Sequence, residues 1–185
     1  MRVISGTARG KKLYSIEGKE TRPTLDRVKE SLFNIIQYEI SDAVILDLFG
    51  GSGALGIEAL SRGAKQVVFG DASKTAIDAI NYNLKSTKFE DKAIVIYKDY
   101  IEVLKKVKDK NIKFDIIFLD PPYKSNFIVN SIKKILKLDL LAKDGIIISE
   151  TDDIEKIKEI EELKNIVIYD KRKYGIAYLV FIRKG

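Results

Sequence analysis

Short apolar runs alternate with longer amphipathic segments through the middle of this 185-residue chain. The apolar runs are rich in Ile, Val and Phe, as expected of strands buried on both faces, and they lie at 44–48, 66–70, 93–97, 114–119 and 144–149. Apolar residues recur at helical spacing near 54–63, 74–86, 100–109, 126–138 and 153–163. Repeated strand–helix units predict an α/β fold with a doubly wound, Rossmann-like sheet.

The two ends of the chain depart from this alternation. Residues 1–20 combine apolar and basic stretches with glycines, which predicts a hairpin or extended arm, and a helix capped by Thr24 is expected to run to about residue 40. Residues 165–175 and 176–185 predict two strands joined by a basic turn, an antiparallel hairpin that completes a seven-stranded sheet. We expect a single domain over 1–185, with the arm and helix at 1–40 and the core at 41–185.

Two residue types that often carry chemistry do not occur. The sequence contains no Cys and no His, so it has no thiolate nucleophile and no imidazole base, and we expect no metal site. A methyl sulfonium donor suits such a chain, because its leaving group departs without help from an acid. The first residues form no apolar signal segment, and no apolar stretch reaches transmembrane length, so we expect a cytoplasmic protein.

Positive charge is concentrated near the N-terminus. The net charge is +6, and residues 1–13 hold Arg2, Arg9, Lys11 and Lys12 without an acidic residue. Together with Arg22, this arm is expected to bind a polyanion. Two alternatives stay open. The many lysines of the chain could simply keep its surface solvated, or the basic residues could protect an edge hairpin from pairing with another chain.

A glycine-rich turn follows the first apolar run, with the sequence Asp47-Leu-Phe-Gly-Gly-Ser-Gly-Ala-Leu-Gly56. Glycines there permit positive φ and a close approach of the backbone to a ligand. Asp71 ends the next strand, 20 residues after Gly51, where a carboxylate can accept hydrogen bonds from ribose hydroxyls. This spacing also fits an NAD-binding fingerprint or a purely structural turn. Asp47 favours S-adenosylmethionine, since its charge attracts a sulfonium but repels a pyrophosphate.

A further carboxylate follows the third apolar run. Asp99 is expected at the carboxyl edge of the sheet, the edge where ligands bind in this topology, and it could accept a hydrogen bond from an adenine amino group. An equally good interpretation is that Asp99 caps the helix expected at 100–109.

The segment Asp120-Pro121-Pro122-Tyr123 directly follows the fourth run and contains two of the three prolines in the chain. A Pro-Pro pair is stiff and donates no backbone hydrogen bond, so the loop presents a fixed array of acceptors. Asp120 and a loop carbonyl could grip the two N–H groups of an exocyclic amine and stabilise positive charge that forms on its nitrogen. Tyr123 could stack on the base. The alternative is a strand-ending loop with a capping Asp.

These motifs together resemble the class I amino-methyltransferases and, more closely, the RsmD family of 16S rRNA (guanine-N2)-methyltransferases. The resemblance extends over essentially all 185 residues and rests on segments 2–6, 10–13, 21–30, 32–34, 47–56, 58–63, 120–123 and 173–175. The glycine loop is widely shared, and the prolyl motif indicates attack by an amino nitrogen. The 22–34 block is what points to this family.

The resemblance implies S-adenosyl-L-methionine as cofactor, S-adenosyl-L-homocysteine as product, and a guanine of 16S rRNA in the small ribosomal subunit as substrate. It implies that Asp47, Gly51 and Gly53 contact the methionine end of the cofactor, Asp71 its ribose and Asp99 its adenine. The same site is expected to include Phe49, Gly50, Ala72 and Tyr100. One departure is that Ala72-Ser73 stand where relatives often have a further charged residue.

The resemblance also assigns the substrate side of the site. Asp120 and Tyr123 would hold the guanine, supported by Pro121 and Pro122. The guanine would leave its stack to reach this pocket, and Asp120 or water would remove the proton. The 22–34 block would lie over the cofactor and face the RNA, which adds Arg27 to the basic residues expected to contact RNA.

Other functions fit parts of the pattern. A DNA adenine-N6 or cytosine-N4 methyltransferase would share the chemistry, but it usually needs a sizeable segment that reads a duplex. An NAD-binding redox or sensor domain would need a hydride partner and normally a substrate domain. A non-catalytic rRNA-binding assembly factor would not need an intact 120–123 motif. We expect a monomeric RNA methyltransferase that does not bind membranes.

Overall fold

The computed structural model describes residues 1–16, 23–122 and 126–185. Its α-helices are α1 (Pro23–Ile35), α2 (Ala54–Ser61), α3 (Lys74–Thr87), α4 (Tyr100–Asp109), α5 (Phe127–Lys137) and α6 (Ile154–Glu161), with a short 3₁₀ helix at Glu90–Lys92. Its strands are β1 (Val44–Asp47), β2 (Gln66–Asp71), β3 (Ala93–Tyr97), β4 (Phe114–Leu119), β5 (Leu141–Thr151), β6 (Ile166–Tyr174) and β7 (Ala177–Lys184). Within these ranges, no helix is both long and apolar enough to cross a membrane.

The seven strands form one sheet in the order β3-β2-β1-β4-β5-β7-β6. Strands β1 to β5 are parallel, and β7 lies antiparallel between β5 and β6. This arrangement confirms the predicted doubly wound α/β sheet with a C-terminal antiparallel hairpin. The strand order reverses between β1 and β4, and in open α/β sheets ligands bind beyond the carboxyl ends of the strands at such a point.

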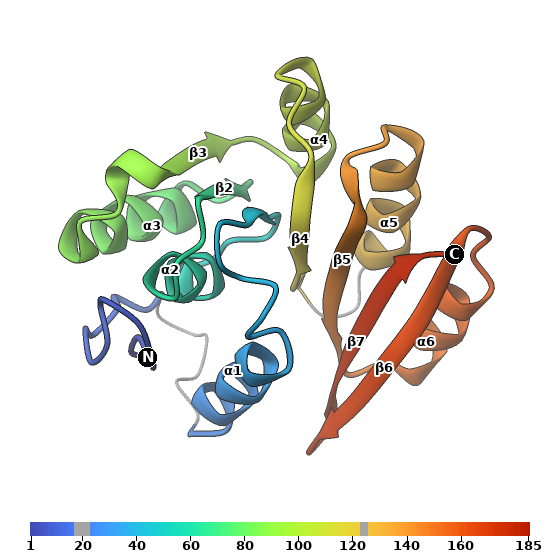
Figure 1. The fold of residues 1–185 in the computed structure, drawn as a ribbon, viewed down its shortest axis with the longest axis horizontal. Coiled ribbons are helices and arrows are strands. Elements are labelled where there is room, and N and C mark those ends of the chain that lie inside the picture. Colours follow the sequence, from blue (N-terminus) through green and yellow to red (C-terminus); the bar gives the residue numbers. More distant parts are fainter. Residues whose placement is uncertain (17–22, 123–125) are drawn as a thin grey trace.

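Helices cover both faces of the sheet, as Figure 1 shows. Alternate residues of a strand point to opposite faces, so Ile116 and Phe118 of β4 join one buried cluster while Ile117 and Leu119 join the other. The first cluster contains apolar residues of α1, α2, α3 and the N-terminal arm, and the second contains those of α4, α5 and α6. The near-continuous apolar runs in the sequence follow from this two-sided burial.

The bounds expected for the first helix were wrong at both ends, because α1 begins at Pro23 and so includes Thr24, the residue expected to cap it. The first helix was expected to reach about residue 40, but α1 ends at Ile35. Ile36 and Ile40 are buried as their spacing suggested, yet the chain closes into a turn in which Glu39 N–H donates to the Ile36 carbonyl at 3.0 Å. Apolar spacing indicates burial and does not fix where helical hydrogen bonding ends. The expected N-terminal hairpin is present, with an antiparallel bridge between Arg2 and Lys12 and a hydrogen bond from Val3 N–H to the Lys11 carbonyl at 2.9 Å.

Candidate active site

The glycine turn has the conformation that its sequence requires. Gly51 and Gly53 have φ values of +55° and +79°, in the left-handed region that side chains rarely adopt. Gly53 N–H donates to the Gly50 carbonyl at 2.7 Å, and the Gly53 carbonyl accepts from Ile57 N–H at 2.9 Å as α2 begins. The turn therefore presents backbone, without side chains at these two positions, at the carboxyl end of β1.

Two carboxylates hold this turn through its backbone amides. Asp47 is only 3% exposed, and its Oδ2 accepts a hydrogen bond from Gly56 N–H at 3.1 Å. Asp71 accepts from Gly51 N–H through Oδ2 at 2.9 Å and from Ser73 N–H through Oδ1 at 2.8 Å. Asp71 is partly exposed, and each carboxylate oxygen can accept more than one bond, so it can still receive hydroxyl donors.

Asp99 lies at the same edge of the sheet, two residues beyond Tyr97, which pairs with Asp71 in the β2–β3 register. It caps α4, and its Oδ1 accepts from Ile101 N–H at 2.9 Å and Glu102 N–H at 3.0 Å. Asp99 is also exposed to solvent. The capping interpretation is therefore confirmed, and a ligand contact remains compatible with it.

Three aromatic rings pack together beside the glycine turn. Phe49 and Phe127 are stacked with ring centroids 5.9 Å apart and planes 12° apart. Tyr100 contacts both rings, with centroids 5.8 Å from Phe49 and 5.1 Å from Phe127. Phe49 and Tyr100 were predicted for the cofactor site, but Phe127 was not, because nothing in the local sequence of α5 sets it apart from a core residue. Together the rings supply a wall of the kind that planar ligands stack on.

Asn83 is another residue that the sequence did not single out. It is fully buried on α3, and its Nδ2 donates to the Ser52 carbonyl at 2.8 Å and the Tyr14 carbonyl at 3.0 Å. Its Oδ1 accepts from Tyr14 N–H at 2.7 Å. Asn83 thus ties the glycine turn to the end of the N-terminal arm. The available signal was an amide residue on the apolar face of a predicted helix.

The prolyl loop leaves the sheet next to the glycine turn. In the β1–β4 pair Asp47 is opposite Phe118, and Leu48 N–H donates to the Phe118 carbonyl at 3.2 Å. Asp120 lies two residues after Phe118, just past the end of β4, and neighbouring strands are about 4.8 Å apart. The glycine turn and the Asp120 loop therefore begin at neighbouring strand ends. Asp120 is half-buried, Pro121 is buried and Pro122 is exposed. Tyr123 lies outside the described residues.

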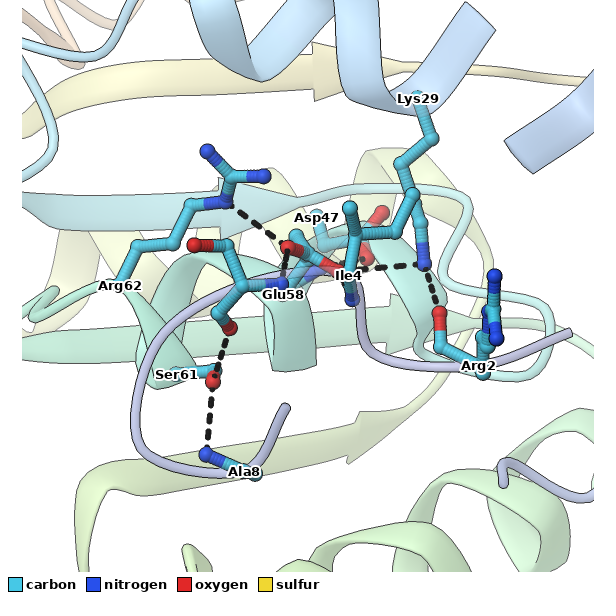
Figure 2. A network of polar contacts seen from close by, with 10 residues as sticks. Arg2, Ile4, Ala8, Lys29, Asp47, Glu58, Ser61 and Arg62 are labelled. Carbon is cyan, nitrogen blue, oxygen red and sulfur yellow. Dashed lines mark hydrogen bonds and ion pairs between the residues drawn. The ribbon is translucent and has the colours of Figure 1, made fainter. Parts of the chain in front are cut away.

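A buried ionic network ties the N-terminal arm and α1 to α2 (Figure 2). Glu58 is fully buried, and its carboxylate accepts from Ile4 N–H at 2.8 Å and Ser5 N–H at 3.0 Å. The same carboxylate lies 3.2 Å from Lys29 Nζ and 2.8 Å from Arg62 Nε. Lys29 Nζ also donates to the Arg2 carbonyl at 2.6 Å. One side chain of the helix that follows the glycine turn therefore holds two other segments.

Burial acts on the charge of Lys29 in this network. Lys29 is 4% exposed, and burial lowers the pKa of its ammonium, while the Glu58 carboxylate beside it opposes that shift. A buried charge needs such a partner, because desolvation is costly without one. The Glu58 carboxylate is therefore the partner that offsets part of the cost of burying the Lys29 ammonium.

A second contact fixes the turn of the arm. Ser61 Oγ donates to the Ser5 carbonyl at 2.6 Å and accepts from Ala8 N–H at 2.9 Å. Gly6 has φ +83°, and a Cβ there would lie 1.8 Å from the Ser61 carbonyl oxygen, so only glycine fits. The arm packs on α2, while the edges of the sheet are β3 and β6. Protection of a sheet edge therefore does not explain its basic residues.

The basic side chains expected to contact RNA project from this anchored arm and from α1. Those within the described ranges are exposed, namely Arg2, Arg9, Lys11, Lys12 and Arg27. Arg22 lies outside the described residues. The arm contacts Ser61 at the end of α2, and it also contacts Asn83, which binds the glycine turn where α2 begins. The arm therefore runs along α2 from one end of this helix to the other.

Comparison with known proteins gives a consistent result. A family model described as Conserved hypothetical protein 95 matches residues 1–183. A Bacillus subtilis protein named "Putative rRNA methyltransferase YlbH" is 38% identical over 184 residues, covering 100% of this chain and 99% of that protein. "Ribosomal RNA small subunit methyltransferase D" of Haemophilus influenzae is 37% identical, covering 96% of this chain and 90% of that protein.

The fold agrees with these relatives. The solved structure of "Putative methyltransferase yhhF" from Escherichia coli superposes with a TM-score of 0.83 at 28% identity and covers 100% of this chain and 98% of that one. The predicted resemblance to class I methyltransferases is thereby confirmed. The chain belongs to the Conserved hypothetical protein 95 family, the RsmD family of methyltransferases.

Proposed function

We propose that this chain transfers the methyl group of S-adenosylmethionine to the exocyclic N2 amine of a guanine in 16S rRNA. The observation that carries the proposal is the meeting of the glycine turn and the Asp120 loop at the ends of adjacent strands β1 and β4. That position lies at the reversal of the strand order, where a bound donor and a bound base would be neighbours.

The groups around the glycine turn fit S-adenosylmethionine better than a dinucleotide. The site gathers three carboxylates, Asp47, Asp71 and Asp99, at the ends of β1, β2 and β3. Carboxylates suit ribose hydroxyls, an adenine amine and a cationic amino-acid end, whereas they would repel a pyrophosphate. Bound there, the cofactor would supply an electrophilic methyl group on a sulfonium. Phe49 and Tyr100 would contribute an aromatic surface beside the adenine.

The chain's own residues would act mainly by position. Asp120 and the carbonyls of the prolyl loop would accept hydrogen bonds from the two N–H groups of the guanine amine and orient its nitrogen. The Asp120 carboxylate would stabilise the positive charge that forms and accept the proton released, directly or through water. Tyr123 would stack on the extruded base. No protein nucleophile is needed, which suits a chain without Cys or His.

The substrate assignment is supported by the relatives and by charge. The relative from H. influenzae is named for the ribosomal RNA of the small subunit, and the B. subtilis relative for rRNA. The exposed basic residues of the arm and the net charge of +6 are suited to a polyanion. An rRNA substrate implies that the enzyme acts in the cytoplasm, and we propose that it acts as a monomer.

The decisive test is methyl transfer with defined substrates. Purified protein and S-adenosylmethionine are incubated with small subunits or 16S rRNA that lack the modification, and the nucleosides are analysed by mass spectrometry. We expect N2-methylguanosine in the wild-type reaction and none with Asp120→Ala. Methylated adenine or cytosine in duplex DNA would instead support the DNA enzyme. Absence of transfer to every substrate, with RNA still bound, would support a non-catalytic assembly factor.

A further inference from the structure

The turn between β6 and β7 lies at the same edge of the sheet as the proposed active site. Leu119 at the end of β4 is level with Ser149 of β5, which is level with Val180 of β7. The last pair of the hairpin, Tyr174 and Ala177, lies three residues beyond Val180. At about 3.3 Å per residue the turn projects roughly 10 Å past the end of β4. Figure 1 shows this end of the hairpin on the side where α1 lies.

The lateral distance is also short. Strands β5 and β7 separate β4 from β6, so the turn is displaced sideways from the start of the Asp120 loop by about 10 to 15 Å at a strand spacing of about 4.8 Å, in addition to its displacement along the strands. Tyr174 additionally hydrogen-bonds Ser31 of α1 through its hydroxyl. The hairpin end and α1 therefore form one connected surface beside the site.

The hairpin end carries the chemistry of a polyanion contact. Residues 169–176 contain three cations and one anion, and Lys171, Arg172 and Lys173 are all exposed. Lys171 pairs with Glu161 at 3.4 Å and Arg172 with Asp170 at 3.0 Å, but both pairs are exposed and worth little, so a phosphate can compete for these cations. Lys173 Nζ lies over the Tyr178 ring at 5.3 Å from its centroid.

An apolar side chain stands at the end of this basic turn. Ile176 is 72% exposed, and exposure of its apolar side chain to water gives no stabilisation. Next to three cations, it is placed to contact the sugar or base of a strand whose phosphates they bind. The sequence pattern alone indicated only that the turn is basic.

We propose that the segment 171–176 is a second RNA contact, on the opposite side of the active site from the N-terminal arm. The arm packs on α2, beside β1 and β2, whereas the hairpin lies beyond β5, so the Asp120 loop is between them. RNA bound at both places would be held across the pocket into which the guanine is extruded. This inference rests on the proposed rRNA substrate.

The test compares matched triple variants. Lys171→Ala/Arg172→Ala/Lys173→Ala is measured against Lys106→Ala/Lys108→Ala/Lys110→Ala, which removes three exposed lysines around the end of α4, at the opposite edge of the sheet. Affinity for 16S rRNA or small subunits is measured at several salt concentrations. For the hairpin variant we expect weaker binding and a salt slope smaller by about 0.7–0.9 for each phosphate that the variant no longer neutralises. The α4 variant should match the wild type.

Two further variants separate charge from fold. Lys171→Arg/Lys173→Arg should keep the wild-type slope, and Ile176→Ser should weaken binding without changing the slope, because it removes no charge. S-adenosylhomocysteine affinity and melting temperature should stay unchanged in all of them. If the hairpin triple variant binds RNA like the α4 control, or if its cofactor affinity falls equally with its RNA affinity, the inference is wrong.

The outcome is distinguishable from failure of the proposed function. Methyl transfer to rRNA by the wild type is measured in the same preparations. Wild-type transfer with an unaltered slope in the hairpin variant rejects only the second RNA contact. Failure of the wild type to methylate any rRNA rejects the proposed function, and the binding comparison still decides whether the hairpin contacts RNA.

Discussion

Glu58 shows how much of this fold depends on a single side chain. It holds the arm through two backbone amides and α1 through Lys29, from a helix that begins at the glycine turn. Glu58→Ala should lower the free energy of unfolding by about 3–5 kcal/mol, because Lys29 is left buried without its carboxylate. Chemical denaturation measures this change.

A double-mutant cycle tests the cause of that destabilisation. Lys29→Met in the Glu58→Ala background removes the orphaned charge, so the double variant should be more stable than Glu58→Ala alone. Arg62→Met, which removes the more exposed partner, should restore less. If Lys29→Met changed the free energy of unfolding equally in the wild type and in Glu58→Ala, the two charges would not be coupled.

The lowered pKa of Lys29 gives a pH dependence of known sign. The folded protein binds the proton of the Lys29 ammonium less tightly than the unfolded chain does, where the pKa of this group is 10.5. Between the folded pKa and 10.5 the unfolded state holds more protons, so this residue makes the free energy of unfolding rise with pH. As pH rises toward 10.5, the free energy of unfolding of the wild type should therefore increase relative to that of Lys29→Met, which has no group that titrates at this position. A difference that stays flat with pH would contradict the lowered pKa.

Asp120 is the residue on which the proposed chemistry depends. Asp120→Ala should abolish methyl transfer and leave S-adenosylhomocysteine affinity nearly unchanged, because this carboxylate is proposed to touch the base and not the donor. Asp120→Asn keeps one acceptor oxygen and should retain more activity than Ala. Single-turnover rates and calorimetry provide the two measurements. Wild-type rates in both variants would leave the prolyl loop with a structural role alone.

Among the elements, the N-terminal arm has a backbone fixed by hydrogen bonds to α2 and carries exposed basic side chains. Glu58 and Ser61 make these hydrogen bonds. Arg9→Ala/Lys11→Ala/Lys12→Ala should weaken rRNA binding and reduce the salt slope by about 0.7–0.9 for each phosphate left unbound, without changing cofactor affinity or melting temperature. The α4 triple variant is again the control. An unaltered slope would leave these residues with a role in solubility only.

The elements themselves were largely predictable, and their exceptions have clear causes. The strands at 93–97 and 114–119 match β3 and β4; the apolar run of β4 follows from burial on both faces, whereas β3 is a partly exposed edge strand. The fifth strand begins three residues earlier than expected, at Leu141, which pairs with Phe114 ahead of a register shift, and the exposed Lys143 and Asp144 interrupt its apolar pattern. Backbone pairing at a strand's start leaves no periodic signal in the side chains.

The arrangement of the whole molecule explains what the sequence could not predict. The carboxylates of the candidate site could be proposed from the sequence because each follows or ends a strand, and strand ends converge in a parallel sheet. The docking of the arm was not predicted, because Ile4 and Glu58 are 54 residues apart and neither is unusual in its own segment. The packing of Phe127 beside the glycine turn was not predicted for the same reason. Its ring contacts Phe49 and Tyr100, which follow other strands.

The same arrangement makes cofactor binding a property of the folded state alone. Asp47, Asp71 and Asp99 follow one another on β1, β2 and the end of β3, so an unfolded chain offers no site. A ligand that binds only the folded state stabilises it by about 2.7 kcal/mol at roughly a hundred times its Kd. S-adenosylhomocysteine should therefore raise the melting temperature, by roughly 2–4 °C per kcal/mol in a chain of this size, and NAD should not.

The proposed contact between Asp71 and the cofactor ribose can be tested by substitution. Asp71→Ala should reduce the thermal shift, since it removes one or two charge-assisted hydrogen bonds worth about 1.5–3 kcal/mol each and also releases Gly51 N–H. Asp78→Ala is the matched control, because Asp78 is an exposed carboxylate on α3 that pairs with Lys74. It should keep the wild-type shift. A full shift in Asp71→Ala would remove this residue from the ribose site, and an equal shift with NAD would mean that the glycine turn accepts a pyrophosphate despite the carboxylates around it.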